Sequence, residues 1–119
     1  MTDPKELKIP NICFSLDEGN EKNSEKYKKQ RIERGFDDTE TYSLDTTIAQ
    51  FVLPRLKRFK EVNVAYPNKM TFEEWDEILD KMIQSFELIT QDNFDIQRDD
   101  EKIKEGLDLF GKHFTKLWW

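Results

Sequence analysis

A cationic cluster in the segment LPRLKRFKE is the strongest candidate for binding chemistry in this sequence. Arg55 carries a planar guanidinium, which can pair with two oxygens of a phosphate or a carboxylate at once. Arg58 lies close to it on a helical wheel, and Lys57 and Lys60 add positive potential. These four residues predict a site for an anionic ligand such as a nucleotide.

The wheel also gives Arg55 an unusual position, near the centre of an apolar arc. A buried charge without a partner would be strongly destabilising, so something must compensate it. A carboxylate such as Asp45 could pair with it, or a kink at Pro54 could move it to the rim of the arc. The third interpretation is that a ligand supplies the negative charge.

Acidic side chains form a second pattern in the segments EEWDE and EGLD. Glu73, Glu74 and Glu77 have the spacing EExxE, and Glu105 and Asp108 have the spacing ExxD. Clustered carboxylates hold Mg²⁺ and bridge it to phosphates. The two motifs resemble the signature of the all-α nucleoside triphosphate pyrophosphatases, which implies a Mg²⁺-dependent hydrolase as an alternative function. Wheels place the same carboxylates opposite the apolar stripes, which favours solvated faces over a metal site.

Other residue types give little support for catalysis. Cys13 is the single cysteine and His113 the single histidine. A zinc site needs several such ligands, so we expect Cys13 to be a small apolar filler and His113 a surface or rim residue. The sequence has no glycine-rich phosphate loop and no serine nucleophile motif. It therefore predicts no catalytic residue and no cofactor.

Three amphipathic helices are expected to position these side chains. The first runs from about Leu44 to Glu61, and the last from about Asp99 to the C-terminus. The middle helix begins after Thr71, which forms a capping box with Glu74. The apolar residues that recur at helical spacing include Leu44, Ile48, Phe51, Leu56 and Phe59, then Trp75, Leu79, Met82 and Phe86, and finally Ile103, Leu107, Phe110, Phe114 and Leu117.

The first part of the chain is more polar. The segment EKNSEKYKKQRIERG predicts a weaker, solvated helix with Tyr27 and Ile32 as apolar anchors and Gly35 as its terminator. Residues 1–21 are expected to form an arm, extended or with a short strand. The predicted fold class is all-α, a small helical bundle in which residues 22–119 form a single helical domain.

Two glycines interrupt the last predicted helix, Gly106 and Gly111. Glycine inside a helix costs about 1 kcal/mol relative to alanine, so such a position needs a reason. Gly111 lies beside Leu107 and Phe114 on the apolar arc. We expect it to let a neighbouring helix or ring approach closely.

The chain ends in LWW, and the two tryptophans differ. If the last helix continues, Trp118 lies at the edge of the apolar arc and belongs to the core, whereas Trp119 lies on the opposite side. Trp119, Leu109 and Leu53 all lie off the arcs of their helices, so we expect them to form a contact surface for a homo-oligomer or another partner. The alternative is that Trp119 folds back over the body.

The charge balance limits the partners. The chain has 25 acidic and 19 basic residues and a net charge of -6. This argues against strong binding to duplex nucleic acid and against an anionic membrane surface. The sequence has no apolar run long enough for a signal peptide or a membrane span, so a cytoplasmic protein is expected.

A longer pattern covers residues 35–119. It comprises GFDDTETYSLDTTIAQFVLPRLKRFKE, a YP turn, MTFEEWDEILDKMIQSFELI and EGLDLFGKHFTKLWW. This pattern resembles a family of small uncharacterised proteins of tailed bacteriophages and prophages. The resemblance implies a phage origin and the host bacterial cytoplasm, and it implies no particular activity. The first 34 residues lie outside it.

Together these observations predict a small phage accessory protein that acts by binding rather than catalysis. One interpretation is an inhibitor of a host defence, which either occludes a host protein or sequesters an anionic nucleotide signal through the cluster at Arg55. The alternatives are the Mg²⁺-dependent pyrophosphatase and a structural or assembly component of the virion.

Overall fold

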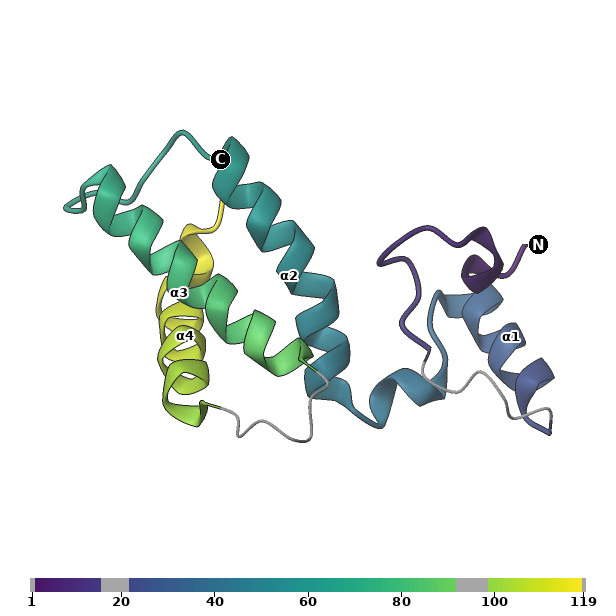
Figure 1. Cartoon of the computed structure of the whole chain (residues 1–119). Coiled ribbons are helices and arrows are strands. Elements are labelled where there is room, and N and C mark those ends of the chain that lie inside the picture. Colours follow the sequence, from purple (N-terminus) through teal and green to yellow (C-terminus); the bar gives the residue numbers. More distant parts are fainter. Residues whose placement is uncertain (1, 16–21, 92–98, 119) are drawn as a thin grey trace. The chain divides into compact units, whose positions relative to one another are not determined.

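The computed structural model describes residues 2–15, 22–91 and 99–118, and these residues form helices and no strand (Figure 1). The α-helices are α1 (Ser24–Arg34), α2 (Leu44–Val62), α3 (Phe72–Thr90) and α4 (Asp100–His113), with short 3-10 helices at Pro4–Leu7, Asp38–Thr41 and Phe114–Lys116. The predicted all-α class is confirmed. No helix in the described ranges has the length and apolar character needed to cross a bilayer.

The chain divides into two compact units, and the division falls inside α2. Residues Met1–Gln50 form the N-terminal unit and residues Phe51–Trp119 form the C-terminal unit. The boundary predicted between the arm and the helical domain, at residue 21, lies outside the described residues.

Local sequence signals set the ends of the helices. Thr71 is the N-cap of α3, as predicted, and its Oγ1 accepts a hydrogen bond from the Glu74 amide at 3.1 Å. The Glu74 carboxylate accepts a hydrogen bond from the Thr71 hydroxyl at 3.2 Å, so the structure shows the N-cap half of the predicted capping box. Gly35 ends α1 in the left-handed conformation with φ of 87°, which glycine adopts without steric cost. α2 is a continuous helix through Pro54.

The C-terminal unit has its core on one face of α3. Trp75, Leu79, Met82 and Phe86 are buried there, and Leu56 of α2 is buried with them in this unit. α4 lies alongside α3 (Figure 1). The rings of Phe86 and Phe110 meet edge to face, with centroids 5.1 Å apart. The predicted apolar stripe of α3 therefore supplies this core. The predicted stripe of α2 contributes Leu56, whereas Leu44, Ile48 and Phe51 are exposed, so the prediction for those three residues is wrong.

The close approach of α3 and α4 depends on a different glycine from the one predicted. A Cβ atom added to Gly106 would lie 2.2 Å from the Ser85 Cβ and 2.5 Å from the Lys81 carbonyl oxygen, whereas one added to Gly111 would meet nothing within 4 Å. The prediction for Gly111 is therefore wrong. Ser85 also donates a hydrogen bond from Oγ to the Ile103 carbonyl at 2.7 Å, which fixes the two helices at this point.

The last helix ends earlier than predicted. α4 ends at His113 and a 3-10 helix follows, which turns faster per residue than an α-helix. Positions after His113 therefore leave the apolar arc: Phe114 is 60% exposed and Trp118 is 70% exposed. The assignment of Trp118 to the core was wrong, and Trp119 lies outside the described residues.

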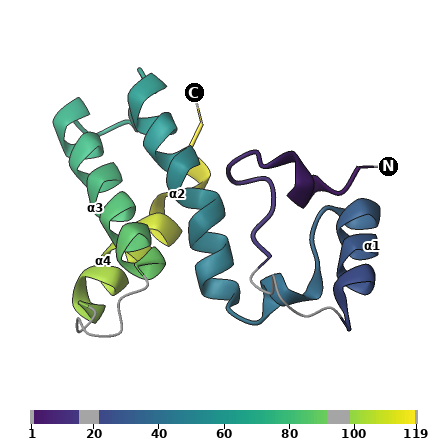
Figure 2. The same cartoon turned by 45° about the vertical axis from the view of Figure 1, so that its right-hand side comes forward.

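The N-terminal unit is organised around a buried charge. Arg31 of α1 is 7% exposed, and its guanidinium makes two hydrogen bonds of 2.7 Å to Asp3 and one of 2.6 Å to Asp37. Both carboxylates are buried as well. The two 3-10 helices that follow these aspartates lie against α1 (Figure 2). A three-residue ionic cluster thus joins three segments of this unit.

Neutral and acidic groups complete that cluster. The Asp37 carboxylate accepts hydrogen bonds from the hydroxyls of Ser15 and Thr39. Glu40 accepts one from the Asp37 amide at 2.7 Å, so Asp37 and Glu40 form a capping box. Glu40 also accepts one from the Phe14 amide at 3.3 Å. The segment between α1 and α2 therefore contains an ordered 3-10 turn that holds the arm.

Candidate functional site

The predicted cationic cluster on α2 is not buried. Arg55 is exposed, its guanidinium lies 3.8 Å from the centroid of the Phe51 ring, and Nη1 donates to the Phe51 carbonyl at 2.8 Å. Of the three interpretations of Arg55, the position at the rim of the apolar arc is the one observed. An aromatic face attracts a cation, so Phe51 provides the compensation.

The other three cations of this cluster are paired with carboxylates. The contacts are Lys57–Glu87 at 3.1 Å, Lys60–Asp80 at 2.5 Å and Arg58–Glu61 at 3.0 Å. Each pair is solvent-accessible, so each contributes little to stability. The pairing nevertheless neutralises positive charge, and an anionic ligand would have to displace a carboxylate here.

The five carboxylates of the alternative hypothesis also have partners or face solvent. Glu105 pairs with Lys81 at 2.8 Å and Asp108 with Lys104 at 2.6 Å. Glu77 lies 3.8 Å from Lys81. The remaining two, Glu73 and Glu74, are exposed in the first turn of α3. Within the described part of the chain, no three acidic, histidine or cysteine side chains form a group that could hold a metal ion.

Of the predicted interface residues, Leu53 and Leu109 do not line the cavity between the turn after α2 and the C-terminal segment. Leu53 and Leu109 are half-buried, and Trp119 lies outside the described residues. Their role in an oligomer stays a prediction.

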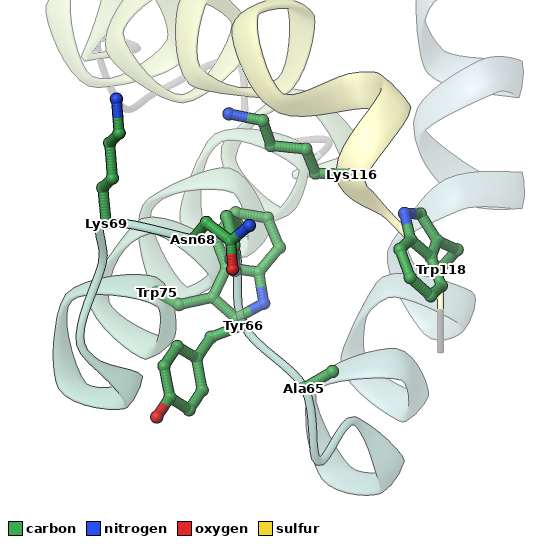
Figure 3. Close-up of a pocket in the computed structure, with 8 residues that line it drawn as sticks. Ala65, Tyr66, Asn68, Lys69, Trp75, Lys116 and Trp118 are labelled. Atoms are coloured by element: carbon green, nitrogen blue, oxygen red, sulfur yellow. The ribbon is translucent and has the colours of Figure 1, made fainter.

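A cavity of about 390 Å³ lies between the turn after α2 and the C-terminal segment. Its lining includes Tyr66, Asn68 and Lys69 from the turn, Trp75 from α3, and Lys116 and Trp118 from the C-terminal end. In the view of Figure 3 the two lysine ammonium groups lie above the three aromatic rings. We call this cavity the tryptophan–lysine pocket.

Local hydrogen bonds hold the turn that forms one wall of the pocket. The Asn63 side chain is buried, and its amide donates to the Ala65 carbonyl at 2.7 Å and accepts from the Ala65 amide at 3.2 Å. The ring of Tyr66 meets that of Phe72 edge to face at 6.4 Å. Lys69 has φ of 72°, a left-handed conformation that is uncommon for a residue with a side chain. The turn is thus a defined structure rather than an open loop.

The base of the pocket is formed by the buried indole of Trp75. Trp75 is 1% exposed and packs edge to face against His113, with ring centroids 5.7 Å apart. His113 is 2% exposed, so the expectation of a surface or rim position was wrong. It was wrong because Trp75 covers this side of α4, which the wheel of α4 alone does not show.

His113 is neutral in this environment. Its Nδ1 is buried and has no hydrogen-bond partner among the described residues. Burial lowers the pKa of His113 below its ordinary value, and the positive charges of Lys116 and Lys112 lower it further. Lys116 also lines the pocket, so its positive charge acts both on His113 and on the pocket.

This lowered pKa predicts acid sensitivity of the C-terminal unit. Between pH 6.5, the ordinary pKa, and the lower folded value, the unfolded chain binds a proton at His113 that the folded chain does not. The free energy of unfolding should therefore fall as pH falls below about 6.5. Urea unfolding followed by tryptophan fluorescence at pH 7.5 and pH 5.5 measures it.

A His113→Phe variant is the control for that measurement. It keeps an aromatic ring against Trp75 and removes the titrating group, and the chain has no other histidine. We expect its stability to change less between the two pH values. An equal loss in both proteins would show that His113 is not the cause.

The sequence analysis missed most of this pocket. The signals were present, an aromatic and a cation within YPNK and again within KLWW. Nothing local connects the two segments, because they are far apart in the chain and meet only when α4 lies along α3. Trp75 was identified as a core residue, and it is one, but its second role at the pocket was not predicted.

Comparisons of this chain with protein-family models, with curated proteins and with solved structures gave no match.

Proposed function

We propose that this protein acts by binding and that it holds a small anionic ligand in the tryptophan–lysine pocket. One observation carries the proposal: Lys69 and Lys116 line the same cavity, and neither makes an ion pair with any described residue. The four cations of α2, by contrast, are paired with carboxylates or stacked on a ring. An incoming anion therefore meets less competition in the pocket than at Arg55.

The chemistry of the lining supports binding rather than turnover. The described lining residues include no carboxylate, imidazole or thiol that could act as a general base, a metal ligand or an activated nucleophile. They do include three aromatic rings, of which Trp75 is buried and Tyr66 and Trp118 are exposed. This lining favours binding over turnover.

The biological setting proposed for this activity is a phage-infected bacterium. The resemblance of residues 35–119 to small phage proteins supports that setting. An accessory protein that sequesters an anionic signal molecule of the host would need a binding pocket and no catalytic group. This setting favours sequestration over a hydrolase.

Isothermal titration calorimetry with a panel of small anions, namely inorganic phosphate, pyrophosphate, citrate and ATP, tests the proposal. We expect at least one to bind, and a Lys69→Gln/Lys116→Gln variant to weaken that binding at least tenfold. The matched control is Lys57→Gln/Lys60→Gln, which removes two lysines already paired with carboxylates and should bind as the unmodified chain does.

Three results would contradict the proposal. Loss of binding in the control alone would move the site to α2, and no binding of any anion would leave the pocket without a ligand. Release of pyrophosphate from ATP in the presence of Mg²⁺, followed by chromatography, would favour the hydrolase.

A further inference from the structure

One of the aromatic rings that line the pocket, that of Trp118, is largely exposed to solvent. Trp118 is 70% exposed although it lines the cavity, so one face of its indole is open to solvent. An indole of this kind offers a stacking surface, and stacking of a nucleobase on an aromatic side chain contributes about 1–3 kcal/mol. A flat ring is the ligand group that this surface fits.

The cationic part of the pocket fits a phosphate. A phosphate monoester carries about -1.5 to -2 charges near neutral pH, which two ammonium groups can balance. Figure 3 shows the Lys116 side chain extending from the 3-10 helix towards the turn that carries Lys69. Lysine binds phosphate as a point charge on a flexible stem, so both side chains can reach the same group.

Asn68 supplies a third kind of contact, since its side chain lies in the pocket beside Trp75 (Figure 3). An amide both donates and accepts hydrogen bonds, which is the combination needed to contact a base edge or a ribose hydroxyl. The cavity volume of about 390 Å³ is near the lower end of the range for small-molecule sites, about 300–1,000 Å³. One nucleotide unit suits this size better than a dinucleotide.

We infer that the ligand of the tryptophan–lysine pocket is a mononucleotide, with its base stacked on Trp118 and its phosphate between Lys69 and Lys116. This inference rests on the proposed function, because it names the class of anion that the pocket takes. The required ligand combines a flat ring and a phosphate in one molecule. Neither part alone uses all of the lining.

Calorimetry with four probes separates the two parts of the ligand. The probes are adenosine 5′-monophosphate, adenosine, ribose 5-phosphate and inorganic phosphate. We expect the nucleotide to bind at least tenfold more tightly than adenosine, which lacks the phosphate, and than ribose 5-phosphate, which lacks the base. Guanosine, cytidine and uridine monophosphates then show whether Asn68 selects among bases.

Single variants assign the contacts. Trp118→Ala should weaken nucleotide binding about tenfold and leave the affinity for ribose 5-phosphate unchanged, and its fold should persist because the side chain is exposed. Lys116→Gln should weaken both ligands. Lys112→Gln is the matched control, an exposed lysine one turn earlier on α4 and outside the pocket lining, and it should weaken neither.

The outcomes distinguish this inference from the proposed function. If ribose 5-phosphate or inorganic phosphate binds as tightly as the nucleotide, and Lys116→Gln abolishes that binding, the nucleotide inference is overturned and the anion pocket stands. If an acidic aromatic peptide binds more tightly than every nucleotide, the ligand is a protein segment and the inference is also overturned. If none of the four probes binds, the nucleotide inference is overturned, and the proposed function fails with it only if pyrophosphate, citrate and ATP do not bind either.

Discussion

In an Arg31→Met variant, α1 should lose about 3–5 kcal/mol of protection against amide hydrogen exchange. The substitution keeps an unbranched side chain of similar length and removes the charge. Asp3 and Asp37 then remain buried without their cation, and the free energy of that state is much higher than that of the intact cluster. Exchange measured by NMR or mass spectrometry on peptides from residues 22–35 reports the change in this unit directly.

Arg34→Met is the matched control in the same helix. Arg34 pairs with Asp38 at 2.6 Å, but both side chains are more than 40% exposed. Solvent-exposed pairs contribute about 0–1 kcal/mol, so this variant should keep nearly all of its protection. Equal losses in the two variants would show that burial of the Arg31 cluster does not stabilise the unit.

The pH dependence of the stability of this unit provides a second, independent test of the Arg31 prediction. Hydrogen bonds from Arg31 lower the pKa of Asp3. Burial alone would raise the pKa of Asp37, but hydrogen bonds from Ser15, Thr39 and Arg31 outweigh it and lower the value. The stability from these carboxylates is thus present above about pH 4 and is lost as pH falls further. In Arg31→Met the hydrogen bonds and the charge of Arg31 are absent, so the pKa values of Asp3 and Asp37 should be lowered less and the stability of the variant should fall less as pH drops below about 4.

The contrast between Arg31 and Thr71 shows which parts of the fold can be predicted from the sequence. Thr71 and Glu74 are three positions apart and their interaction is local, so the start of α3 could be predicted. Arg31 appears in the sequence as one more charge on a solvated helix. Its partner Asp3 is 28 positions away in the arm, and nothing in the local pattern indicates that the two meet.

The same limit explains the candidate site. Apolar periodicity identified the face of α3 that forms the core, because that face depends on neighbours within a few turns. It did not identify which apolar residues of α2 are buried, and it failed again after His113, where the chain changes from an α-helix to a 3-10 helix and Phe114 and Trp118 are exposed. Trp118 and Lys116 lie in that part, so the residues that form the pocket were those that the wheel placed least well.

Gly106→Ala should lower the free energy of unfolding of the C-terminal unit by about 1–3 kcal/mol, the usual effect of overpacking. The new methyl group would lie 2.2 Å from the Ser85 Cβ and 2.5 Å from the Lys81 carbonyl oxygen. Neither atom is the flexible end of a side chain, so α4 must move away from α3. All three tryptophans lie in this unit, and urea unfolding followed by their fluorescence measures the loss.

For Gly111→Ala, in the same helix, we expect the opposite effect on stability. Nothing lies within 4 Å of its added methyl group, so the substitution should stabilise the helix by up to about 1 kcal/mol through helix propensity alone. Destabilisation by both alanines to the same extent would show that glycine is needed for the backbone of α4 rather than for its contact with α3.

A Ser85→Gly substitution in the Gly106→Ala background identifies which contact is responsible. It removes the Cβ at 2.2 Å and leaves the Lys81 carbonyl at 2.5 Å, and it also removes the hydrogen bond from Ser85 to Ile103. If the side-chain clash dominates, the double variant should be more stable than the sum of the two single losses predicts, because the two substitutions affect one contact. If the losses simply add, the backbone of α3 limits the approach, and only glycine at position 106 permits the observed distance between the helices.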